Sequence, residues 1–312
     1  MPLPTLPRLL TLEFLEHLEV ERNLSALTIR DYSLYLRRFC DWFDGEGHQD
    51  IRDLDMHLLR KYRVYLSRHI DELGRSLSLS TQSYHIICLR SFLKWLVKND
   101  VAVLHPEKVD LPKPEPQAMK FLDTEQMSRL LSQPRLSSKS GYRDRAILEV
   151  LFSTGLRVSE LVSLNREQVN LKHKEFGVIG KGKKPRVVFL SDQSADWLTR
   201  YLSTREDTWS PVFVRLSRDQ PDPKSDGEEM RLTPRSVQRL VKEYVEKAHL
   251  PIKVTPHGIR HSFATDLLRN GAGLRDVQEM LGHKNIQTTQ IYTHVTRPEL
   301  REIHKKFHSK EL

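Results

Sequence analysis

The sequence predicts a mainly helical protein of two domains, with a small antiparallel β-sheet in the second domain. Three observations support this prediction. Apolar residues recur at helical spacing over most of the chain, short β-type runs cluster between residues 169 and 190, and a proline-rich segment separates the two parts. With 312 residues, the chain is long enough for two domains that each bury a core.

The first domain is expected to contain four helices. Their bounds are Leu9–Val20, Leu27–Phe43, Met56–Ile70 and Thr81–Lys98. Ser25 and Ser80 are the expected N-caps of the second and fourth helices, because a serine hydroxyl can accept from a free backbone N–H at a helix start. Cys40 and Cys88 lie in apolar helical patterns, and we expect them to be buried free thiols.

The boundary between the domains is predicted at Leu111–Pro116, where every second residue is a proline. Proline excludes helix and favours an extended, semi-rigid segment. We therefore place the first domain at residues 1–111, a linker at 112–120 and the second domain at 121–312.

The second domain is expected to open with a capping box, because Asp123 and Gln126 have the required spacing. Further helices are predicted at 142–153, 192–202 with Asp192 as the cap, and 233–248. The β-type runs are Val169–Leu171, Glu175–Ile179 and Arg186–Leu190. Residues 218–230 are polar and lack apolar spacing, so we expect a flexible surface insert there.

Composition and charge fit a DNA-binding protein without proving one. Hydrophobic residues make up 38% and charged residues 29%, as in soluble globular proteins. Residues 116–312 hold 34 Lys+Arg against 24 Asp+Glu, whereas residues 1–115 hold 16 against 17. No apolar run is long enough to span a bilayer, and the start of the chain turns acidic where a signal peptide would be cleaved. We expect a cytoplasmic protein with no membrane partner.

The chemistry is concentrated in the run from Thr255 to Val295. Thr255-Pro256 predicts a helix start and Gly271 a stop, which gives a helix at about 257–270. His257 and Arg260 are three residues apart and share one face of that helix. An imidazole and a guanidinium are thus presented together.

Four further residues suited to phosphate chemistry lie outside that helix, and three of them follow a glycine closely. They are Arg157 after Gly155, Lys181 in a glycine turn, His283 after Gly282, and then Tyr292. A guanidinium can bind two phosphate oxygens, an imidazole or lysine can transfer a proton, and a phenol can act as a nucleophile. Each of these residues alone is more often an ordinary surface residue, but together they indicate phosphoryl transfer through a phosphotyrosine.

The order of these motifs resembles the tyrosine recombinase (phage integrase) family, and most of all its Xer-type members. The matching segments are TGLRVSELVSL, GKGKKPR, HGIRHSFAT and LGHKNIQTTQIYTHV. The family pattern of Arg, Lys, His-x-x-Arg, His and Tyr falls on Arg157, Lys181, His257, Arg260, His283 and Tyr292. The resemblance is strong over 121–295 and weaker before it.

The resemblance implies a two-domain clamp around double-stranded DNA that works without a metal ion, ATP or another cofactor. It also implies a tetramer on two recombination sites, formed with itself or with a paralogous recombinase, and a tail helix at 297–310 that docks into a neighbouring protomer. Polar residues near helix starts or on exposed helix faces are the candidate DNA contacts. They are Thr28, Arg30, Tyr32, Ser83, His85, Arg235, Gln238 and Arg239.

Three alternatives stay open at this point. A type IB topoisomerase would use the same chemistry, and a non-catalytic DNA-binding regulator would share the basic surface. His257 and His261 also have the i, i+4 spacing of a zinc site, although no glutamate adjoins His257. The sequence does not decide between dimer resolution and mobile-element integration or excision.

Overall fold

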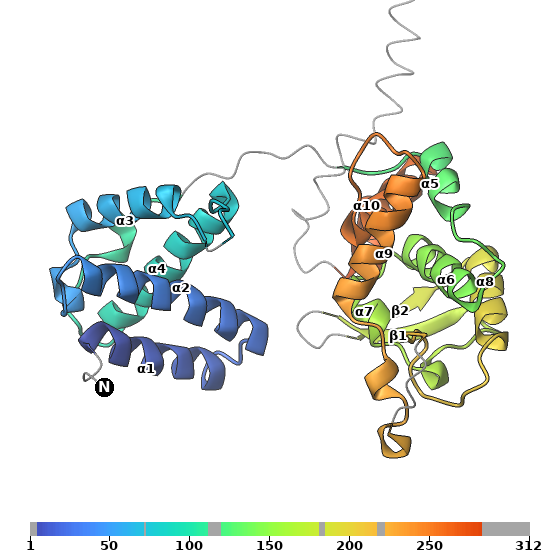
Figure 1. Ribbon diagram of the computed structural model, residues 1–312, viewed down its shortest axis with the longest axis horizontal. Helices are drawn as coiled ribbons and strands as arrows, with labels where there is room; N and C mark the ends of the chain where they lie inside the picture. The colour runs from blue at the N-terminus through green and yellow to red at the C-terminus, as the bar shows by residue number, and fades with distance from the viewer. Residues whose placement is uncertain (1–4, 72, 112–119, 181–184, 217–221, 283–312) are drawn as a thin grey trace, which may run out of the picture. The chain divides into compact units, whose positions relative to one another are not determined.

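The computed structural model describes residues 5–71, 73–111, 120–180, 185–216 and 222–282. The chain divides into two units, Met1–Gln117 and Ala118–Leu312, and the division falls within the proposed linker. Helices dominate both units, and the sheet of the second unit is small and antiparallel, which confirms the predicted fold class (Figure 1). No helix of the described residues has the length and apolar character to cross a membrane.

Unit 1 is a bundle of four helices. They are α1 (Leu6–Val20), α2 (Ala26–Gly45), α3 (Met56–Arg68) and α4 (Leu79–Lys98). Helix α2 packs against both α1 and α4 (Figure 1). The core between them is rich in aromatic rings, including the buried side chains of Phe14, Phe39, Tyr62 and Phe92.

The N-caps of two helices in unit 1 were predicted from the sequence. Ser25 caps α2 as predicted, since its hydroxyl accepts from the backbone N–H of Thr28. The prediction for α4 was wrong by two residues, because Ser78 rather than Ser80 accepts from the N–H of Thr81. Cys40 and Cys88 are buried free thiols, as expected, and burial raises the pKa of Cys40 to about 11.

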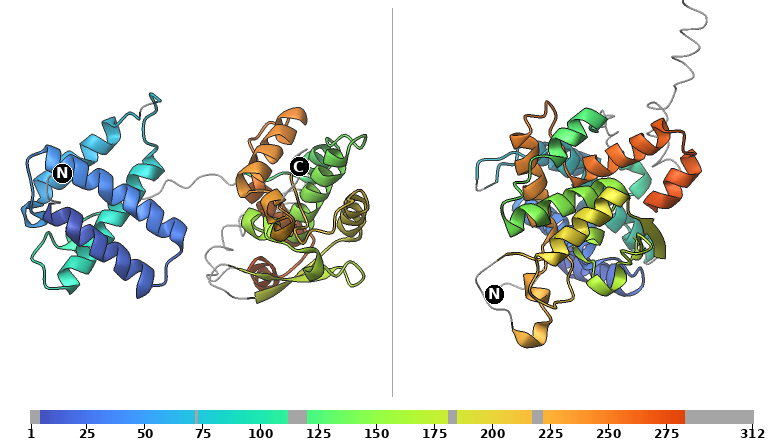
Figure 2. Two further views of the ribbon diagram at one scale, coloured as in Figure 1. Left: turned by 60° about the horizontal axis from the view of Figure 1, so that its bottom comes forward. Right: turned by 90° about the vertical axis from the view of Figure 1, so that its right-hand side faces the viewer.

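Unit 2 is built around α6 (Lys139–Thr154), whose central residues are almost completely buried. The surrounding helices are α5 (Thr124–Leu131), α7 (Val158–Val162), α8 (Asp192–Ser203), α9 (Pro234–Lys247), α10 (Pro256–Arg269) and α11 (Leu274–Leu281). Helix α6 packs against α8 and α10 (Figure 2). Its central position explains why even its charged residues are largely buried and form ion pairs, Arg143 with Asp144 and Arg145 with Glu149.

The sheet of unit 2 has two strands among the described residues, β1 (Glu175–Ile179) and β2 (Pro185–Phe189). The predicted strand Val169–Leu171 was wrong, because within it only Asn170 makes an isolated bridge, to Glu175. The sheet buries Phe176, Val178 and Val188 on one face. The other face leaves Val187 and Phe189 more than half exposed, at 54% and 55%.

Capping in unit 2 follows the predictions with one correction. Asp123 and Gln126 form the expected capping box, and Thr233 caps α9. The cap of α8 is Ser191 rather than Asp192, which occupies the first helical position. Of the expected insert at 218–230, the described part contains two short 3₁₀ turns, and Glu228 in the second pairs with Arg231.

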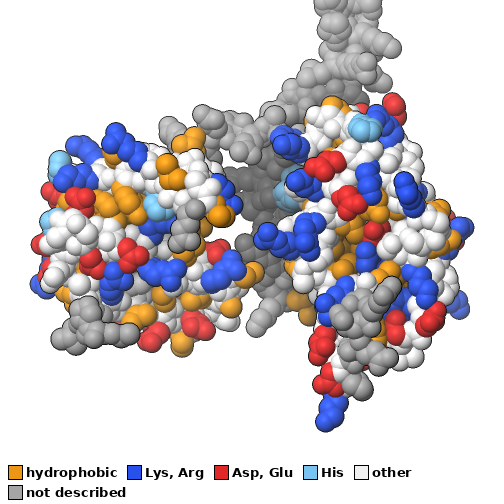
Figure 3. Space-filling model, in the orientation of Figure 1, with side chains coloured by type: hydrophobic (Ala, Val, Ile, Leu, Met, Phe, Trp, Pro, Cys, Tyr) orange, Lys and Arg blue, Asp and Glu red, His pale blue; other side chains and the backbone are white. Residues whose placement is uncertain are grey.

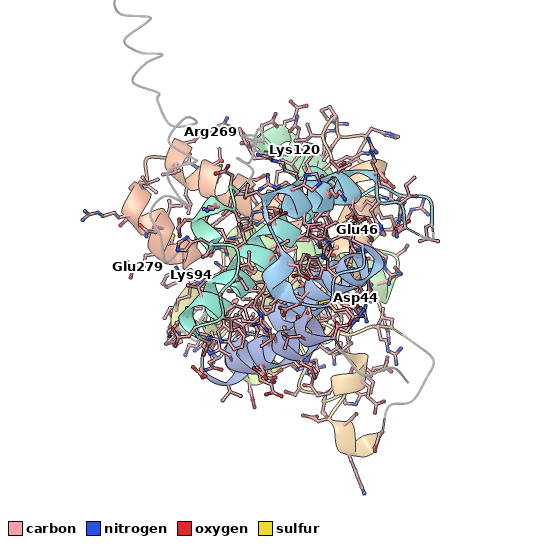
Figure 4. The ribbon with its side chains drawn as sticks, turned by 90° about the vertical axis from the view of Figure 1, so that its left-hand side faces the viewer. Asp44, Glu46, Lys94, Lys120, Arg269 and Glu279 are labelled. Atoms are coloured by element: carbon pink, nitrogen blue, oxygen red, sulfur yellow. The ribbon has the colours of Figure 1, made fainter. Side chains whose placement is uncertain are left out.

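The beginning of unit 2 is attached to α10. The N–H of Leu122 donates to the Ser262 hydroxyl at 2.8 Å, and that hydroxyl donates to the Gly258 carbonyl. The Arg269 guanidinium lies over the Phe121 ring, 5.4 Å from its centroid. Lys120 and Arg269 mark this edge of the unit in Figure 4. These contacts fix the helix that carries His257 and Arg260.

Candidate active site

Arg157 sits at a turn that the sequence makes rigid. Helix α6 ends at Gly155, which adopts the left-handed conformation with φ of 59°, and Arg157 is the N-cap of α7. A Cβ atom at Gly155 would lie 2.4 Å from the Phe263 ring, so both backbone and packing require glycine there. Leu156, between the two, is fully buried and anchors the turn.

The Arg157 side chain is held by Glu160. One carboxylate oxygen accepts from the Arg157 guanidinium at 2.9 Å, and the other accepts from the Arg157 backbone N–H at 2.9 Å. Arg186 on β2 binds the same carboxylate with both terminal nitrogens, at 3.0 and 2.7 Å. Although burial alone would raise the pKa of Glu160, the hydrogen bonds and charges of the two arginines lower it to about 2.

Arg260 joins the Arg157 turn to the end of α11. Its guanidinium donates to the carbonyl of Gly155 at 2.6 Å and to the carbonyl of Leu281 at 2.5 Å. The residue is only 2% exposed. Because Leu281 lies two positions before His283, one side chain ties together two of the predicted catalytic segments.

His257 lies at the second position of α10, close enough to Arg260 and Arg157 to be affected by their charges. Although His257 keeps an exposed surface, the surrounding protein displaces enough water to lower its pKa, and the charges of Arg260 and Arg157 lower it further. The shift favours a neutral imidazole, which can accept a proton. The structure therefore brings together Arg157, His257 and Arg260, three of the six predicted catalytic residues.

The His257 ring also makes an edge contact with His261, with centroids 4.2 Å apart. Among the described residues, no group of three His, Cys, Asp or Glu side chains gathers around this pair or elsewhere. The pair therefore supplies two of the ligands that a zinc site of three or four protein donors would need.

Lys181, His283 and Tyr292 lie outside the described residues. The flanking segments are nevertheless described. Strand β1 leads to Gly180 immediately before Lys181, and Gly282, the left-handed C-cap of α11, immediately precedes His283. The catalytic roles of these three residues stay predictions.

The predicted DNA contacts have different environments. Arg30 on α2 and Arg235, Gln238 and Arg239 on α9 are exposed, whereas Thr28, Tyr32 and Ser83 are partly buried. Lysine and arginine side chains gather over α9 on the face shown in Figure 3. The exposed positions are compatible with DNA contact, which stays a prediction.

His85 requires a correction, because it is 1% exposed and cannot meet DNA directly from this position. Its Nε2 lies 3.0 Å from an Arg38 nitrogen and its Nδ1 lies 3.3 Å from the Tyr62 hydroxyl. Arginine has only donors, so Nε2 must accept and the ring proton belongs on Nδ1. Burial, and then the Arg38 charge, lower the pKa of His85 to about 4. His85 is a core residue of unit 1.

Sequence reasoning missed Glu160 and Arg186 as parts of this site. Both lie in motifs that had already stood out, TGLRVSELVSL and GKGKKPR. The available signal was an acid three residues after Arg157, at the spacing of a capping box, and an arginine at the end of the basic turn. Their pairing across 26 residues is a tertiary contact that no local pattern reveals.

Family models match most of the chain. The phage integrase family model covers residues 120–299, and the model of the phage integrase N-terminal SAM-like domain covers residues 12–100. Tyrosine recombinase XerD of Staphylococcus epidermidis is 34% identical over 303 residues, which cover 95% of this chain and 97% of that protein. XerD of Staphylococcus aureus is 34% identical over 302 residues, with the same coverage.

Solved structures show the same architecture. XerA recombinase is 28% identical with a TM-score of 0.50, covering 97% of this chain and 99% of its own. The fold is shared by XerH bound to a palindromic difH substrate, which is 23% identical with a TM-score of 0.68, covering 92% of this chain and 82% of its own. It is also shared by the Tn1549 transposon integrase bound to transposon right end DNA, which is 19% identical with a TM-score of 0.69, covering 98% of this chain and 100% of its own. The chain therefore belongs to the phage integrase family, as an Xer-like tyrosine recombinase, an enzyme that cuts and rejoins DNA strands.

Proposed function

We propose that Tyr292 is the nucleophile of this recombinase and that Arg157 and Arg260 hold the scissile phosphate. The Tyr292 oxygen would form a bond to phosphorus while the bond to the 5′-oxygen breaks, leaving a 3′-phosphotyrosyl link. The 5′-hydroxyl of a partner strand would then attack this link and release the tyrosine. Two rounds of exchange would pass through a Holliday junction.

The observation that supports this proposal most is the fixed pair of arginines beside a neutral imidazole. Arg157 and Arg260 are both anchored by hydrogen bonds, and both charges act on His257. Preorganised positive charge stabilises the charge that develops on phosphate oxygens, and removing one such contact typically costs about 100- to 1,000-fold in rate. The lowered pKa of His257 suits it to accept the Tyr292 proton.

The remaining roles rest on the family resemblance. Lys181 would donate a proton to the departing 5′-oxygen, and His283 would donate a hydrogen bond to the phosphate. The number of protons is then conserved, because His257 takes one proton from the phenol while Lys181 gives one to the leaving group. The energy of the broken phosphodiester stays in the tyrosyl link, so rejoining needs no nucleotide cofactor.

The proposal is tested with a duplex that carries a nick near the cleavage point, so that a short product diffuses away and traps the covalent complex. Wild-type protein should form a covalent protein–DNA band in the presence of EDTA. Tyr292→Phe should bind the duplex equally well and form no band, since it loses one oxygen only. A band formed by Tyr292→Phe, or a requirement for metal in the wild-type reaction, would contradict the proposed chemistry.

We further propose that the protein acts as a tetramer on two double-stranded DNA sites, with itself or with a paralogous recombinase. The tail sequence from Thr296 contains Leu300, Ile303 and Phe307 at helical spacing. An apolar groove of about 480 Å³ between α6, β2, α10 and α11, lined by Phe152, Phe189 and Phe263 among others, offers a surface of matching character.

This assembly is tested by deleting residues 296–312. The truncated protein should bind a single site as a folded monomer and fail to join two sites, measured by native gel shift and by recombination. Undiminished recombination would exclude the tail as the link between protomers.

The biological role of this recombinase would be dimer resolution or mobile-element integration or excision. It would act in the cytoplasm, where the DNA is accessible.

A further inference from the structure

Arg186 links its own strand to two other segments of the site, α7 and the end of α11, although it has no place among the proposed catalytic groups. It is the second residue of β2, the strand that begins at Pro185, four positions after Lys181 in the sequence (Figure 1). Its terminal nitrogens bind both oxygens of Glu160, and its Nε donates to the carbonyl of Met280 at 3.1 Å. Gly282 leaves room for it, since a Cβ there would lie 3.1 Å from the Arg186 side chain.

The Arg186 side chain is committed to protein acceptors, because its three nitrogens bind the Glu160 carboxylate and the Met280 carbonyl. It is 9% exposed, and Glu160 is 6% exposed, whereas the Arg157 side chain is 29% exposed. Of the two arginines that share the carboxylate, Arg157 therefore has the more exposed side chain. Any effect of Arg186 on the reaction must be transmitted through another residue.

The charge balance of this cluster explains how the effect is transmitted. Glu160 carries one negative charge and accepts four hydrogen bonds, two of them from Arg186 and two from Arg157. A carboxylate has about four acceptor sites, so Arg186 fills half of its capacity. Without Arg186, Glu160 would be free to form a bidentate pair with Arg157, which would neutralise Arg157 and turn its donors inward.

We propose that Arg186 is a positioning residue that shares the Glu160 carboxylate so that Arg157 keeps its net charge and its outer donors for the scissile phosphate. The cluster of two arginines and one glutamate then retains one positive charge. The contact with Met280 extends the same support to the end of α11. This inference rests on the proposed role of Arg157 in binding phosphate.

The test compares two nicked duplexes, one with a normal scissile phosphate and one with a neutral methylphosphonate at that position. Arg186→Gln should bind DNA normally and cleave the phosphodiester about 10- to 100-fold more slowly than wild type, a loss like that seen when the hydrogen-bonded partner of a metal ligand is removed. On the methylphosphonate it should retain nearly the wild-type rate, because there is no phosphate charge for Arg157 to stabilise. Arg186→Lys should show an intermediate defect.

A double variant locates the effect at Glu160. Adding Glu160→Gln to Arg186→Gln removes the unshared negative charge and should recover much of the phosphodiester rate. Rates that fall by the product of the two single defects would overturn the proposal, since Arg186 would then act independently of the carboxylate.

Arg205 provides the matched control for losing a buried arginine. It pairs with Asp207 and donates to the carbonyls of Pro211 and Val212, with 2% of its side chain exposed. Arg205→Gln should lower thermal stability and leave the ratio of the two cleavage rates unchanged. If Arg186→Gln slowed both substrates by the same factor, its role would be structural only.

Arg157→Ala separates this inference from the function on which it rests. If Arg157→Ala is selectively slow on the charged substrate and Arg186→Gln is not, only the inference about Arg186 fails. If Arg157→Ala itself is equally slow on both substrates, the proposed phosphate contact of Arg157 fails as well.

Discussion

In each unit an arginine contacts a buried titratable side chain, and the electrostatic results are opposite. In unit 1, Arg38 donates to His85, whose pKa falls to about 4, so the imidazole is neutral. In unit 2, Arg186 and Arg157 share Glu160, whose pKa falls to about 2, so the carboxylate is charged. The first arrangement leaves one cation beside a neutral acceptor, and the second leaves two cations around one anion.

This difference separates a buried polar group that serves the fold from one that serves the reaction. His85 is enclosed by Tyr62, Tyr35 and Arg38 and has no access to a substrate. Glu160 is equally enclosed, but it holds an arginine that stays partly exposed at the site. Substitutions in the unit 2 cluster should therefore change rates, whereas substitutions in the unit 1 cluster should change stability.

The largest expected effect is on the rate of DNA cleavage, and it concerns Lys181. If Lys181 protonates the departing 5′-oxygen, Lys181→Ala should slow cleavage of normal DNA by about 100- to 10,000-fold. A substrate with sulfur in place of the bridging 5′-oxygen releases a thiolate and needs little acid catalysis. Lys181→Ala should cleave that substrate far better than normal DNA, as measured by covalent complex formation.

Arg260→Ala is the control for the lysine experiment, because its contribution to phosphate charge is the same for both leaving groups. It should stay slow on both substrates. Equal defects of Lys181→Ala on the two substrates would mean that the lysine binds phosphate only.

A smaller effect is expected from the glycine that shapes the Arg157 turn. Gly155→Ala puts a methyl group into the Phe263 ring and an alanine into the left-handed region, with an expected loss of about 2 to 5 kcal/mol in the free energy of unfolding. Gly47 in unit 1 also has positive φ, but nothing lies within 4 Å of its Cβ position. Gly47→Ala should therefore cost only the backbone term of about 1 to 2 kcal/mol.

Calorimetric or urea unfolding of the two full-length variants measures this difference. Cleavage by Gly155→Ala at a temperature where it remains folded should also fall, because the Gly155 carbonyl accepts from Arg260. Equal stability losses at the two glycines would show that the ring contact relaxes without cost.

The unit 1 cluster predicts a pH dependence of stability. The unfolded imidazole binds a proton near pH 6.5 and the folded one near pH 4, so the folded state takes up fewer protons between these values. The free energy of unfolding should therefore fall as pH drops from 6.5 to 4, by up to about 3 kcal/mol, and this contribution is fully present above pH 6.5. His85→Gln should remove that part of the acid sensitivity.

Exposed His57 is the matched control in the same unit. His57→Gln should leave the acid sensitivity unchanged when unfolding is followed from pH 4 to pH 7. A His85→Gln profile parallel to that of wild type would show that His85 is protonated in the folded protein.

Local features of this chain were predictable and tertiary pairings were not. The positions of most helices to within about three residues, the Ser25 and Thr233 caps and the glycine stop before Arg157 follow from residues adjacent in sequence. His85 was misplaced because a histidine near a helix start looks exposed, although it lies four residues before the buried Leu89 and therefore on the core side of α4.

The third predicted strand was wrong and the Arg186–Glu160 pair was missed, for related reasons. Val169–Leu171 has β-type composition, but most of its backbone finds no ladder partner. Arg186 ends a run of basic residues that reads as a solvated turn, and only the fold brings Glu160 to it. The pairing of Arg186 depends on its burial against Glu160, and such burial is not a property of the local sequence.

The most direct test of the central claim is to identify the atom that links protein to DNA. Wild-type protein would be trapped on the nicked duplex, digested with nuclease and protease, and the modified peptide sequenced by mass spectrometry. The proposed mechanism predicts a nucleotide joined through its 3′-phosphate to Tyr292. A nucleotide on any other residue, or one joined through its 5′ end, would contradict it.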